Sequence, residues 1–268
     1  MSEAPKPGRD GDAEVRRQSR RHTRRSFLTG GLVAAAGAAG WYWLRQASLE
    51  DGIPWPARRV LQFNERLTGA LFSDKRLAST YDRSRAAEDP RVNGGIGLRT
   101  EVDPTAWRLQ VEDAGGRNLS LSLDDIKKLP RTEMVTQLRC IEGWAEIIHW
   151  GGVPLADFAA HYRFGTRSGN APDPHRNSAD WWSYVSLATP DERYYVGLDI
   201  ASVLHPQTLL CWEINGQPLS SEHGAPLRLV IPVKYGVKNI KRIGTIRFQD
   251  ERPADYWAER GYDWYAGL

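Results

Sequence analysis

Three apolar runs in the second half of the chain constrain its fold more than any other feature. They read TLLCWEI (208–214), LRLVIPV (227–233) and IKRIGTIRF (240–248), and all three are rich in β-branched or large aliphatic residues. Segments rich in Gly, Asn and Pro, such as NGQ (215–217) and GAP (224–226), separate them. Short apolar runs between turn residues are typical of buried β-strands. The pattern therefore predicts that this half of the chain is rich in strands.

The rest of the body adds alternating strands and a few short helices. PLADFAAHY (154–162) opens with a proline, which suits the first turn of a predicted helix, and DIASVL (199–204) is also predicted to be helical. We therefore expect an α+β fold, with one mixed, strand-rich domain over residues 93–268. Further strands are predicted in TAWRLQV (105–111), LSLSL (119–123), EMVTQLRC (133–140), SYVSLAT (183–189) and ERYYVGL (192–198).

The first 45 residues are interpreted as a targeting segment and are kept out of the fold. Residues 1–26 form a basic region, and its end, from Thr23 to Leu28 (TRRSFL), closely matches a twin-arginine export signal. Residues 27–45 follow as an apolar signal or anchor helix, close to the minimum length for a membrane span. A cleaved signal and a retained anchor both remain open. Either one predicts a body that is periplasmic or anchored to the outer side of the cytoplasmic membrane.

Residues 46–92 are predicted to form an N-terminal arm. Within it, VLQFNERLTGALF (60–72) carries apolar residues at helical spacing after Pro56. That spacing predicts a short amphipathic helix. The segment that follows, up to Pro90, is charged and is expected to be a loop.

The charge of the chain lies mainly in its N-terminal region. The formal net charge of all 268 residues is +3. Residues 1–26 hold eight Lys or Arg and four Asp or Glu, a net +4, so the remainder carries a net −1. A body with this balance has no global basic surface for nucleic acid. We therefore expect no nucleic-acid partner.

The two cysteines, Cys140 and Cys211, stand in unlike settings. Cys211 lies within an apolar run and is expected to be a buried thiol. Cys140 follows Arg139 at the end of a predicted strand, and a neighbouring guanidinium favours the thiolate, which is both a nucleophile and a metal ligand. On residue type alone, a buried and inert Cys140 is an equally good interpretation.

A second candidate element is the basic segment EHGAPLRLVIPVKYGVKNIK (222–241). It holds Arg228, Lys234, Lys238 and Lys241 among residues that favour turns. Arginine and lysine in such a setting can bind a phosphate or carboxylate group. The alternative is a solvated basic edge of a β-sheet.

Three motifs occur in order along the body: RCIEGWAEIIHWGGVPL (139–155), HGAPLRLVIPVKYGVKNIK (223–241) and ADYWAERGYDWYAGL (254–268). Together they resemble the molybdopterin-binding domain of the sulfite oxidase superfamily. The resemblance covers about residues 91–268. It implies the mixed fold of that superfamily, an oxidoreductase activity and a Mo-molybdopterin cofactor. The twin-arginine motif fits this independently, because that route carries proteins already folded around their cofactor.

The resemblance also implies roles for single residues. Cys140 matches the cysteine whose thiolate binds molybdenum. The pocket near Arg139, Trp144 and Tyr235 is expected to select the substrate. Lys238 is added to the cofactor contacts on charge and spacing alone. The matched cofactor contacts are Asn93, Thr189, His223, Arg228, Asn239, Ile240 and Lys241, the last three in the segment that meets the pterin phosphate.

The chain departs from both branches of the family that it resembles. Ile141-Glu142-Gly143-Trp144 follows the cysteine, where sulfite oxidases carry a Gly-Asn-Arg type of segment that helps to bind an anion. The Cys-x-Glu-x-Trp pattern is closer to exported methionine-sulfoxide reductase catalytic subunits. Those proteins, however, have Pro-Trp where this chain has Pro232-Val233. S-oxide reduction and sulfite dehydrogenation therefore both remain open.

The expected reaction is a two-electron oxo transfer on a small-molecule substrate outside the cytoplasm. No haem or flavin motif is present, so a separate electron-transfer partner is expected, such as a membrane cytochrome or a quinone-linked subunit. Two other classes remain as alternatives. A metal-free thiol enzyme would use Cys140 with a base such as His149 or His223. A non-catalytic exported binding domain would keep the fold without the cofactor.

Overall fold

The computed structural model describes residues 9–50, 52–173 and 178–268, with side chains described from residue 26 onward. The chain forms two compact units, Met1–Arg58 and Arg59–Leu268. In the first unit, the long helix α1 (Arg9–Gln46) precedes a small antiparallel hairpin of β1 (Leu49–Glu50) and β2 (Ile53–Pro54). The side chains of the twin-arginine pair lie outside the described residues.

One helix of the described chain is long and apolar enough to cross a membrane. It is the part of α1 from Ser26 to Gln46, whose mean hydropathy reaches 1.2. Phe27, Leu32 and Trp41 on it are exposed. The expected apolar helix over residues 27–45 is thus present as a helix, and length and composition alone make it compatible with a signal or an anchor.

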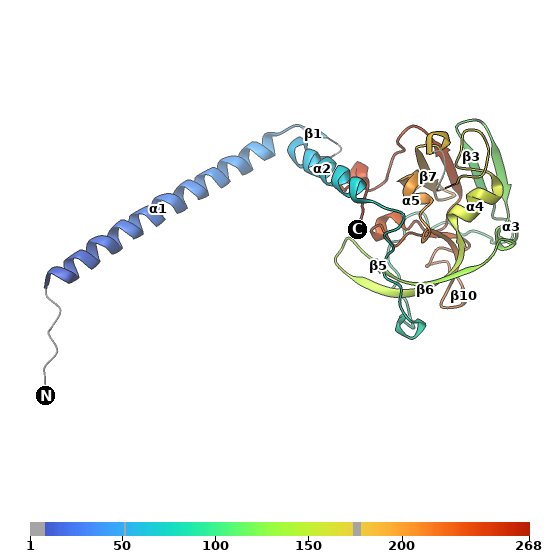
Figure 1. Ribbon diagram of the computed structural model, residues 1–268, viewed down its shortest axis with the longest axis horizontal. Coiled ribbons are helices and arrows are strands. Elements are labelled where there is room, and N and C mark those ends of the chain that lie inside the picture. The colour runs from blue at the N-terminus through green and yellow to red at the C-terminus, as the bar shows by residue number, and fades with distance from the viewer. Residues whose placement is uncertain (1–8, 51, 174–177) are drawn as a thin grey trace. The chain divides into compact units, whose positions relative to one another are not determined.

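The body holds two five-stranded sheets. The first is antiparallel and has the order β10-β9-β6-β5. Strand β11 pairs with Leu209, Leu210 and Cys211 of β9, on the edge of β9 that faces away from β6. Strands β5 and β6 of this sheet form the longest hairpin of the described chain, which runs along the lower edge of the body in Figure 1. Its strands are β5 (Thr132–Arg139), β6 (Ala145–Pro154), β9 (Leu209–Ile214), β10 (Gln217–Pro218) and β11 (Arg228–Val230).

The second sheet has the order β4-β3-β12-β7-β8, and only its β3–β12 pair is parallel. The strands predicted over residues 183–189 and 192–198 are present as β7 and β8, which pair as an antiparallel hairpin around Pro190. The sheet is built from β3 (Leu109–Asp113), β4 (Asn118–Leu121), β7 (Tyr184–Ala188), β8 (Tyr195–Asp199) and β12 (Thr245–Gln249).

Short helices connect these strands. Ser122 caps α3 (Leu123–Lys127) in a capping box with Asp125, and Asp199 caps α5 (Ile200–Val203). The remaining helices are α2 (Trp55–Leu71), α4 (Leu155–Tyr162) and four short 3-10 helices, η1 (Arg83–Arg85), η2 (Ser178–Asp180), η3 (Gly236–Lys238) and η4 (Ala258–Arg260).

Strand β9 is buried on both faces. Leu210 and Trp212 belong to the main core, which also contains residues of both sheets and of α4. Leu209 and Cys211 point to the opposite face and join a smaller cluster with Trp150 of β6. Successive side chains of a strand alternate between faces, so a continuous apolar run such as TLLCWEI fits a strand covered on both sides. The predicted α+β, strand-rich fold is therefore confirmed, and Cys211 is the buried free thiol that its setting predicted.

Candidate functional site

Cys140 lies in the tight turn that joins β5 to β6. Its amide donates to the carbonyl of Trp144 at 2.9 Å, and the amide of Gly143 donates back to the Cys140 carbonyl at 3.1 Å. Gly143 has φ +92°, a left-handed conformation that glycine adopts without strain. The turn leaves Cys140 partly exposed as a free thiol at the end of the sheet. The predicted position of this cysteine at a strand end is confirmed.

A cleft opens at this turn, and segments far apart in the sequence form its walls. Seven of the sequence-predicted site residues line it. They come from the loop before the first sheet, from the β5–β6 turn, from the loop leading into β11 and the first residue of that strand, and from the segment that follows η3. These seven residues are Asn93, Cys140, Trp144, His223, Arg228, Asn239 and Lys241.

Arg228 brings a buried positive charge to the cleft. Its side chain is 4% exposed, and its guanidinium lies over the ring of Trp150 at 4.7 Å. It donates to the carbonyls of His223 and Asn239, but its Nε has no hydrogen-bond partner. Burial lowers the pKa of Arg228 to about 10. A buried donor without a partner, on a side chain that lines a cleft, is a fitting contact for an anionic ligand.

Lys241 is the second cation of the cleft. Its Nζ donates to three backbone carbonyls, those of Asn93 at 2.6 Å, Gly94 at 3.2 Å and Glu222 at 2.7 Å. Burial, and then the nearby charge of Arg228, lower the pKa of Lys241 to about 8. Within the part of the chain that the structure describes, no carboxylate forms an ion pair with either cation. Glu222 opposes the shift of the Lys241 pKa through space, so an anionic ligand could add the direct ion pair that neither cation has among the described residues.

Gly224 allows the wall that carries His223 to approach Lys241 closely. It has φ +101°, and a Cβ at this position would lie 2.7 Å from Cβ of Lys241. His223 itself is held by Ser220 Oγ at Nδ1 and by the carbonyl of Pro90 at Nε2. The histidine thus links two loops that both border the cleft.

The turn at Gly236 brings η3 close to the cysteine. A Cβ on Gly236 would lie 3.4 Å from the carbonyl oxygen of Arg139 and 3.7 Å from Cα of Cys140. Asn239, just after this helix, accepts from the amide of Ile231 and donates to the carbonyl of Tyr235. Its side chain therefore fixes the path of the segment that faces Cys140.

Glu142 and Trp144 form a polar and aromatic border beside the thiol. The indole of Trp144 donates to Glu142 at 3.1 Å, and the guanidinium of Arg91 lies 4.7 Å from the centre of a Trp144 ring. The amide of Asn93 lies 3.5 Å from the same Glu142 oxygen and 3.6 Å from Sγ of Cys140. The thiol is thus bordered by one carboxylate, one guanidinium and an indole.

Five residues of the predicted site do not line this cleft. Arg139 donates to Gln137 and lines a separate cavity of about 430 Å³. Tyr235 is half-buried, and its backbone amide donates a hydrogen bond to the carbonyl of Ala266. Thr189 is buried and bonds to Asp191, and Ile240 is buried in the main core. Lys238 is the fifth.

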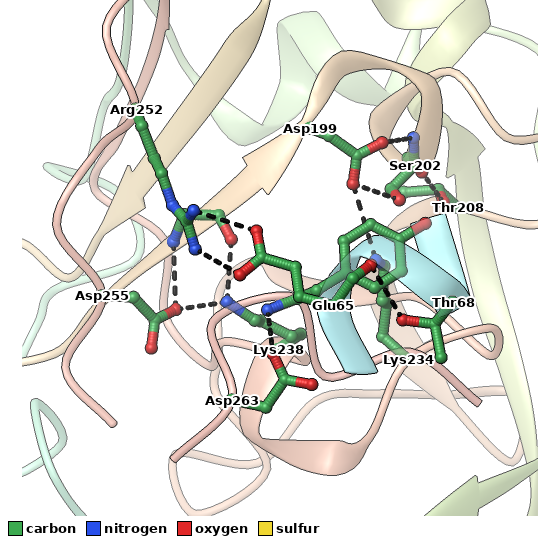
Figure 2. Close-up of polar contacts among 12 residues, drawn as sticks. Glu65, Thr68, Asp199, Ser202, Thr208, Lys234, Lys238, Arg252, Asp255 and Asp263 are labelled. Carbon is green, nitrogen blue, oxygen red and sulfur yellow. Dashed lines mark hydrogen bonds and ion pairs between the residues drawn. The ribbon is translucent and has the colours of Figure 1, made fainter. Parts of the chain in front are cut away.

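Lys238 corrects an expectation that rested on charge and spacing. Its Nζ is buried and pairs with Asp255 at 2.5 Å, and it also donates to the carbonyl of Gly197 (Figure 2). Burial lowers its pKa, while Asp255 opposes that shift. Because its charge is already compensated away from the cleft, Lys238 is not available to an anion there. Its side chain instead ties η3 to the C-terminal segment.

Several residues of the cleft were not predicted from the sequence. Arg91, Trp150 and Tyr194 line it, as do Trp257 and Tyr262 from the C-terminal segment. Arg242, just outside it, fastens two loops by donating to the carbonyls of Leu98, Thr100 and Ala225 and to Ser221. The charge of Arg91 and Arg242 gave a weak signal, but the aromatic residues had none that separated them from core residues.

The donor set fits a molybdenum–pterin cofactor. The thiol at one end of the cleft is a soft sulfur donor, and donors of this kind bind soft metals. The Nε of Arg228, which has no hydrogen-bond partner, and the positive charge of Lys241, which forms no ion pair among the described residues, suit the phosphate of a pterin. In the described residues, no group of three or more His, Cys, Asp or Glu side chains could hold a metal by itself.

Comparison with known proteins agrees with this geometry. A model of the oxidoreductase molybdopterin-binding domain matches residues 96–257. The catalytic subunit MsrP of a protein-methionine-sulfoxide reductase from Burkholderia mallei is 30% identical over 92% of this chain and 76% of its own length. A protein of Azospira oryzae, provisionally named as the subunit YedZ1 of such a reductase, is 31% identical over 91% of this chain and 85% of its own length. The sulfane dehydrogenase SoxCD of Paracoccus pantotrophus is 19% identical over 57% of this chain and 40% of that chain, with a TM-score of 0.47.

These matches confirm two expectations that the sequence motifs raised. The protein is an oxidoreductase, and its cofactor is Mo-molybdopterin. The readings as a metal-free thiol enzyme and as a non-catalytic binding domain lose their support. The chain belongs to the oxidoreductase molybdopterin-binding domain family, within the sulfite oxidase superfamily that its motifs resemble.

Proposed function

We propose that the protein reduces an S-oxide by a two-electron oxo transfer outside the cytoplasm. The observation that carries this proposal is the placement of Glu142 and Trp144 beside the thiol of Cys140. In the reaction, the sulfur–oxygen bond of the substrate breaks, two electrons and two protons are taken up, and a thioether and water are released. When bound, the cofactor would supply the two-electron redox chemistry and the oxygen-accepting capacity that this reaction needs.

The residues of the cleft would divide the remaining work. The thiolate of Cys140 would ligate the metal, and the amide of Asn93, 3.6 Å from Sγ, would donate to that thiolate. Arg228 and Lys241 would hold the phosphate, with His223 and Asn239 fixing the walls around the pterin. Trp144, Trp257 and Tyr262 would border the substrate with apolar surface.

The charge next to Cys140 favours a neutral substrate over a dianion. Glu142 would repel sulfite, whereas an uncharged S-oxide avoids that repulsion and suits aromatic walls. The names of the reductases from Burkholderia and Azospira point in the same direction. A matched Xanthomonas campestris catalytic subunit also bears that name, although this chain spans only 47% of its length.

Arg91 favours sulfite oxidation as the second candidate. Its guanidinium stacks on Trp144 at the cleft and could compensate an anionic substrate. The two activities are separable in one assay with artificial redox dyes. We expect the holoenzyme to turn over S-oxides, including methionine sulfoxide in peptides, with reduced viologen as donor. Sulfite-dependent reduction of an electron acceptor, without S-oxide turnover, would reverse the assignment.

We further propose that the protein is exported by the twin-arginine route and stays anchored by the Ser26–Gln46 helix. The Arg24-Arg25 pair and the apolar helix behind it support this. Residues 93–268 would then be the cofactor-binding domain, with residues 46–92 as the arm that links it to the anchor. Electrons would come from a separate membrane cytochrome or quinone-linked subunit, because the related reductases are named as subunits.

The location has its own test. Export should be lost when both arginines are changed to lysine, and the mature protein should keep its N-terminus and sediment with membranes. A soluble mature protein that begins after residue 46 would show instead that the helix is a cleaved signal.

A further inference from the structure

Helix α2 (Trp55–Leu71) leaves its apolar side largely exposed, although its last residue, Leu71, also borders the cavity that Arg139 lines. Val60, Phe63, Leu67 and Leu71 are 59%, 63%, 47% and 55% exposed. Their spacing of three, four and four residues places them on one face, so they form a single stripe. We call these four residues the α2 stripe. The only buried residue of the helix is Arg58.

The opposite side of α2 contacts the body through polar groups. Glu65 forms a two-pronged ion pair with Arg252, with both N–O distances at 2.9 Å (Figure 2). Thr68 lies beside Gly267, where an added Cβ would be 3.5 Å from Cβ of Thr68. An amphipathic helix on a soluble protein normally buries its apolar face and exposes its polar face. In α2 the order is reversed, so the stripe lacks the cover that an apolar face requires.

A short connecting segment joins helix α2 to the proposed anchor. The apolar helix ends at Gln46 and α2 begins at Trp55, so eight residues join them. Even fully extended, eight residues span at most about 28 Å. Several exposed aromatic residues that suit a membrane interface occur on either side of this link, at Trp41, Tyr42, Trp43 and Trp55.

Charge beside the stripe favours a lipid surface as its occupant. Arg59 and Arg66 are exposed and seven residues apart, so they border the stripe on one side of the helix. Basic residues next to an apolar face are typical of helices that lie in the interface of a membrane with anionic lipids.

We infer that α2 lies in the outer interface of the cytoplasmic membrane, with the α2 stripe in contact with lipid. The polar contacts of Glu65 then hold the body against this helix, so α2 fixes one side of the body toward the bilayer. This inference rests on the proposed insertion of the Ser26–Gln46 helix, and the experiment reports on that helix separately.

The test uses the full-length holoenzyme in nanodiscs of phosphatidylethanolamine and phosphatidylglycerol. Single nitroxide labels are placed by Phe63→Cys and Leu67→Cys on the stripe, by Val33→Cys in the apolar helix and by Lys127→Cys on α3 as an exposed control. The unsubstituted protein, treated identically, gives the background from Cys140 and Cys211. The measurement is the accessibility of each label to oxygen and to a water-soluble nickel complex.

We expect the labels at 63 and 67 to lose nickel accessibility relative to the label at 127 and to gain oxygen accessibility. Labels at 63 and 67 that match position 127, while position 33 is in lipid, would overturn the inference and leave the anchor intact. Labels at 33, 63 and 67 that are all as accessible to the nickel complex as position 127 would overturn both the lipid contact of α2 and the insertion of the Ser26–Gln46 helix. Spin–spin broadening at 63 that disappears on dilution with unlabelled protein would mean that a second copy covers the stripe, and would also overturn the lipid contact.

Discussion

The side-chain amide of Asn93 lies 3.6 Å from Sγ of Cys140, although 47 residues separate the two in sequence. The backbone carbonyl of the same asparagine accepts a hydrogen bond from Nζ of Lys241 at 2.6 Å. One residue therefore contacts both the thiol end and the cationic end of the cleft, which gives it two separable functions.

Replacing the side chain of Asn93 should affect the thiol end alone. In Asn93→Leu the carbonyl still accepts from Lys241, but the thiolate loses a donor. A hydrogen bond to a charged group contributes about 1.5–3 kcal/mol, so kcat/KM should fall about 10- to 100-fold. Molybdenum content should stay unchanged. A parallel loss of molybdenum, measured by elemental analysis, would place Asn93 among the groups that retain the cofactor.

The two cysteines offer a matched pair of variants. Cys140→Ser should abolish turnover while circular dichroism shows an intact fold, because Cys140 is at a turn and its volume hardly changes. Cys211→Ala should keep turnover and lower the free energy of unfolding by about 1 kcal/mol, since Cys211 is buried in the core. Wild-type activity in Cys140→Ser would rule out thiolate ligation of the metal.

The cationic end of the cleft should control cofactor retention. Arg228→Met combined with Lys241→Met removes both charges that would face the pterin phosphate. We expect a loss of most of the molybdenum and pterin per chain after gel filtration. Lys128→Met is the control and should keep full occupancy, because Lys128 is an exposed lysine just after α3 that pairs with Asp125 and does not line the cleft. Full occupancy in the double variant would remove both residues from the phosphate site.

Lys238 and Asp255 should be coupled in stability. Lys238→Met leaves the Asp255 carboxylate buried without its partner and should lower the free energy of unfolding by about 3–5 kcal/mol. Adding Asp255→Asn should recover part of this loss, although its other oxygen caps the turn at Trp257. Urea unfolding of the two single variants and the double variant measures the coupling, and additive effects would contradict the ion pair.

Lys234 should make stability rise with pH. Burial lowers its pKa in the folded state to about 7, while Asp199 opposes the shift. An unfolded lysine titrates near its ordinary value of about 10.4, so between about pH 7 and pH 10 the unfolded chain binds more protons. Wild-type stability should therefore rise relative to Lys234→Met by up to about 1.4 kcal/mol per pH unit in that window. Urea unfolding at several pH values tests this, and a pH-independent difference between the two proteins would contradict it.

The sequence predicted the strands well where their pattern was local. The end of β5 at Cys140 and the hairpin of β7 and β8 follow from apolar runs next to turn residues. Strand β6 was not predicted, because its residues Trp150, Gly151 and Gly152 lack a simple alternation. Gly152 allows a close approach to β9, where an added Cβ would lie 2.1 Å from the carbonyl of Leu210. A contact of this kind depends on the partner strand and leaves no local pattern.

The site was predictable as far as motifs reached. The motif matched Cys140, Arg228 and Lys241, and all three meet in one cleft. Charge alone misplaced Lys238, because its partner Asp255 lies 17 residues away in a segment whose path no periodicity reveals. Proximity in sequence misplaced Arg139, because adjacent residues at the end of a strand point to opposite faces.

The side chains of Arg242 and Lys241 hold the loops of the cleft mainly by donating hydrogen bonds to backbone carbonyls of those loops. A peptide carbonyl is present whatever residue carries it, so these hydrogen bonds make little demand on the side chains at positions such as 98, 100 and 222. New loop sequences could be introduced there without loosening the frame. The cleft is thus a suitable starting point for libraries of loop variants, in which the substrate preference changes while the residues that would bind the cofactor stay in place.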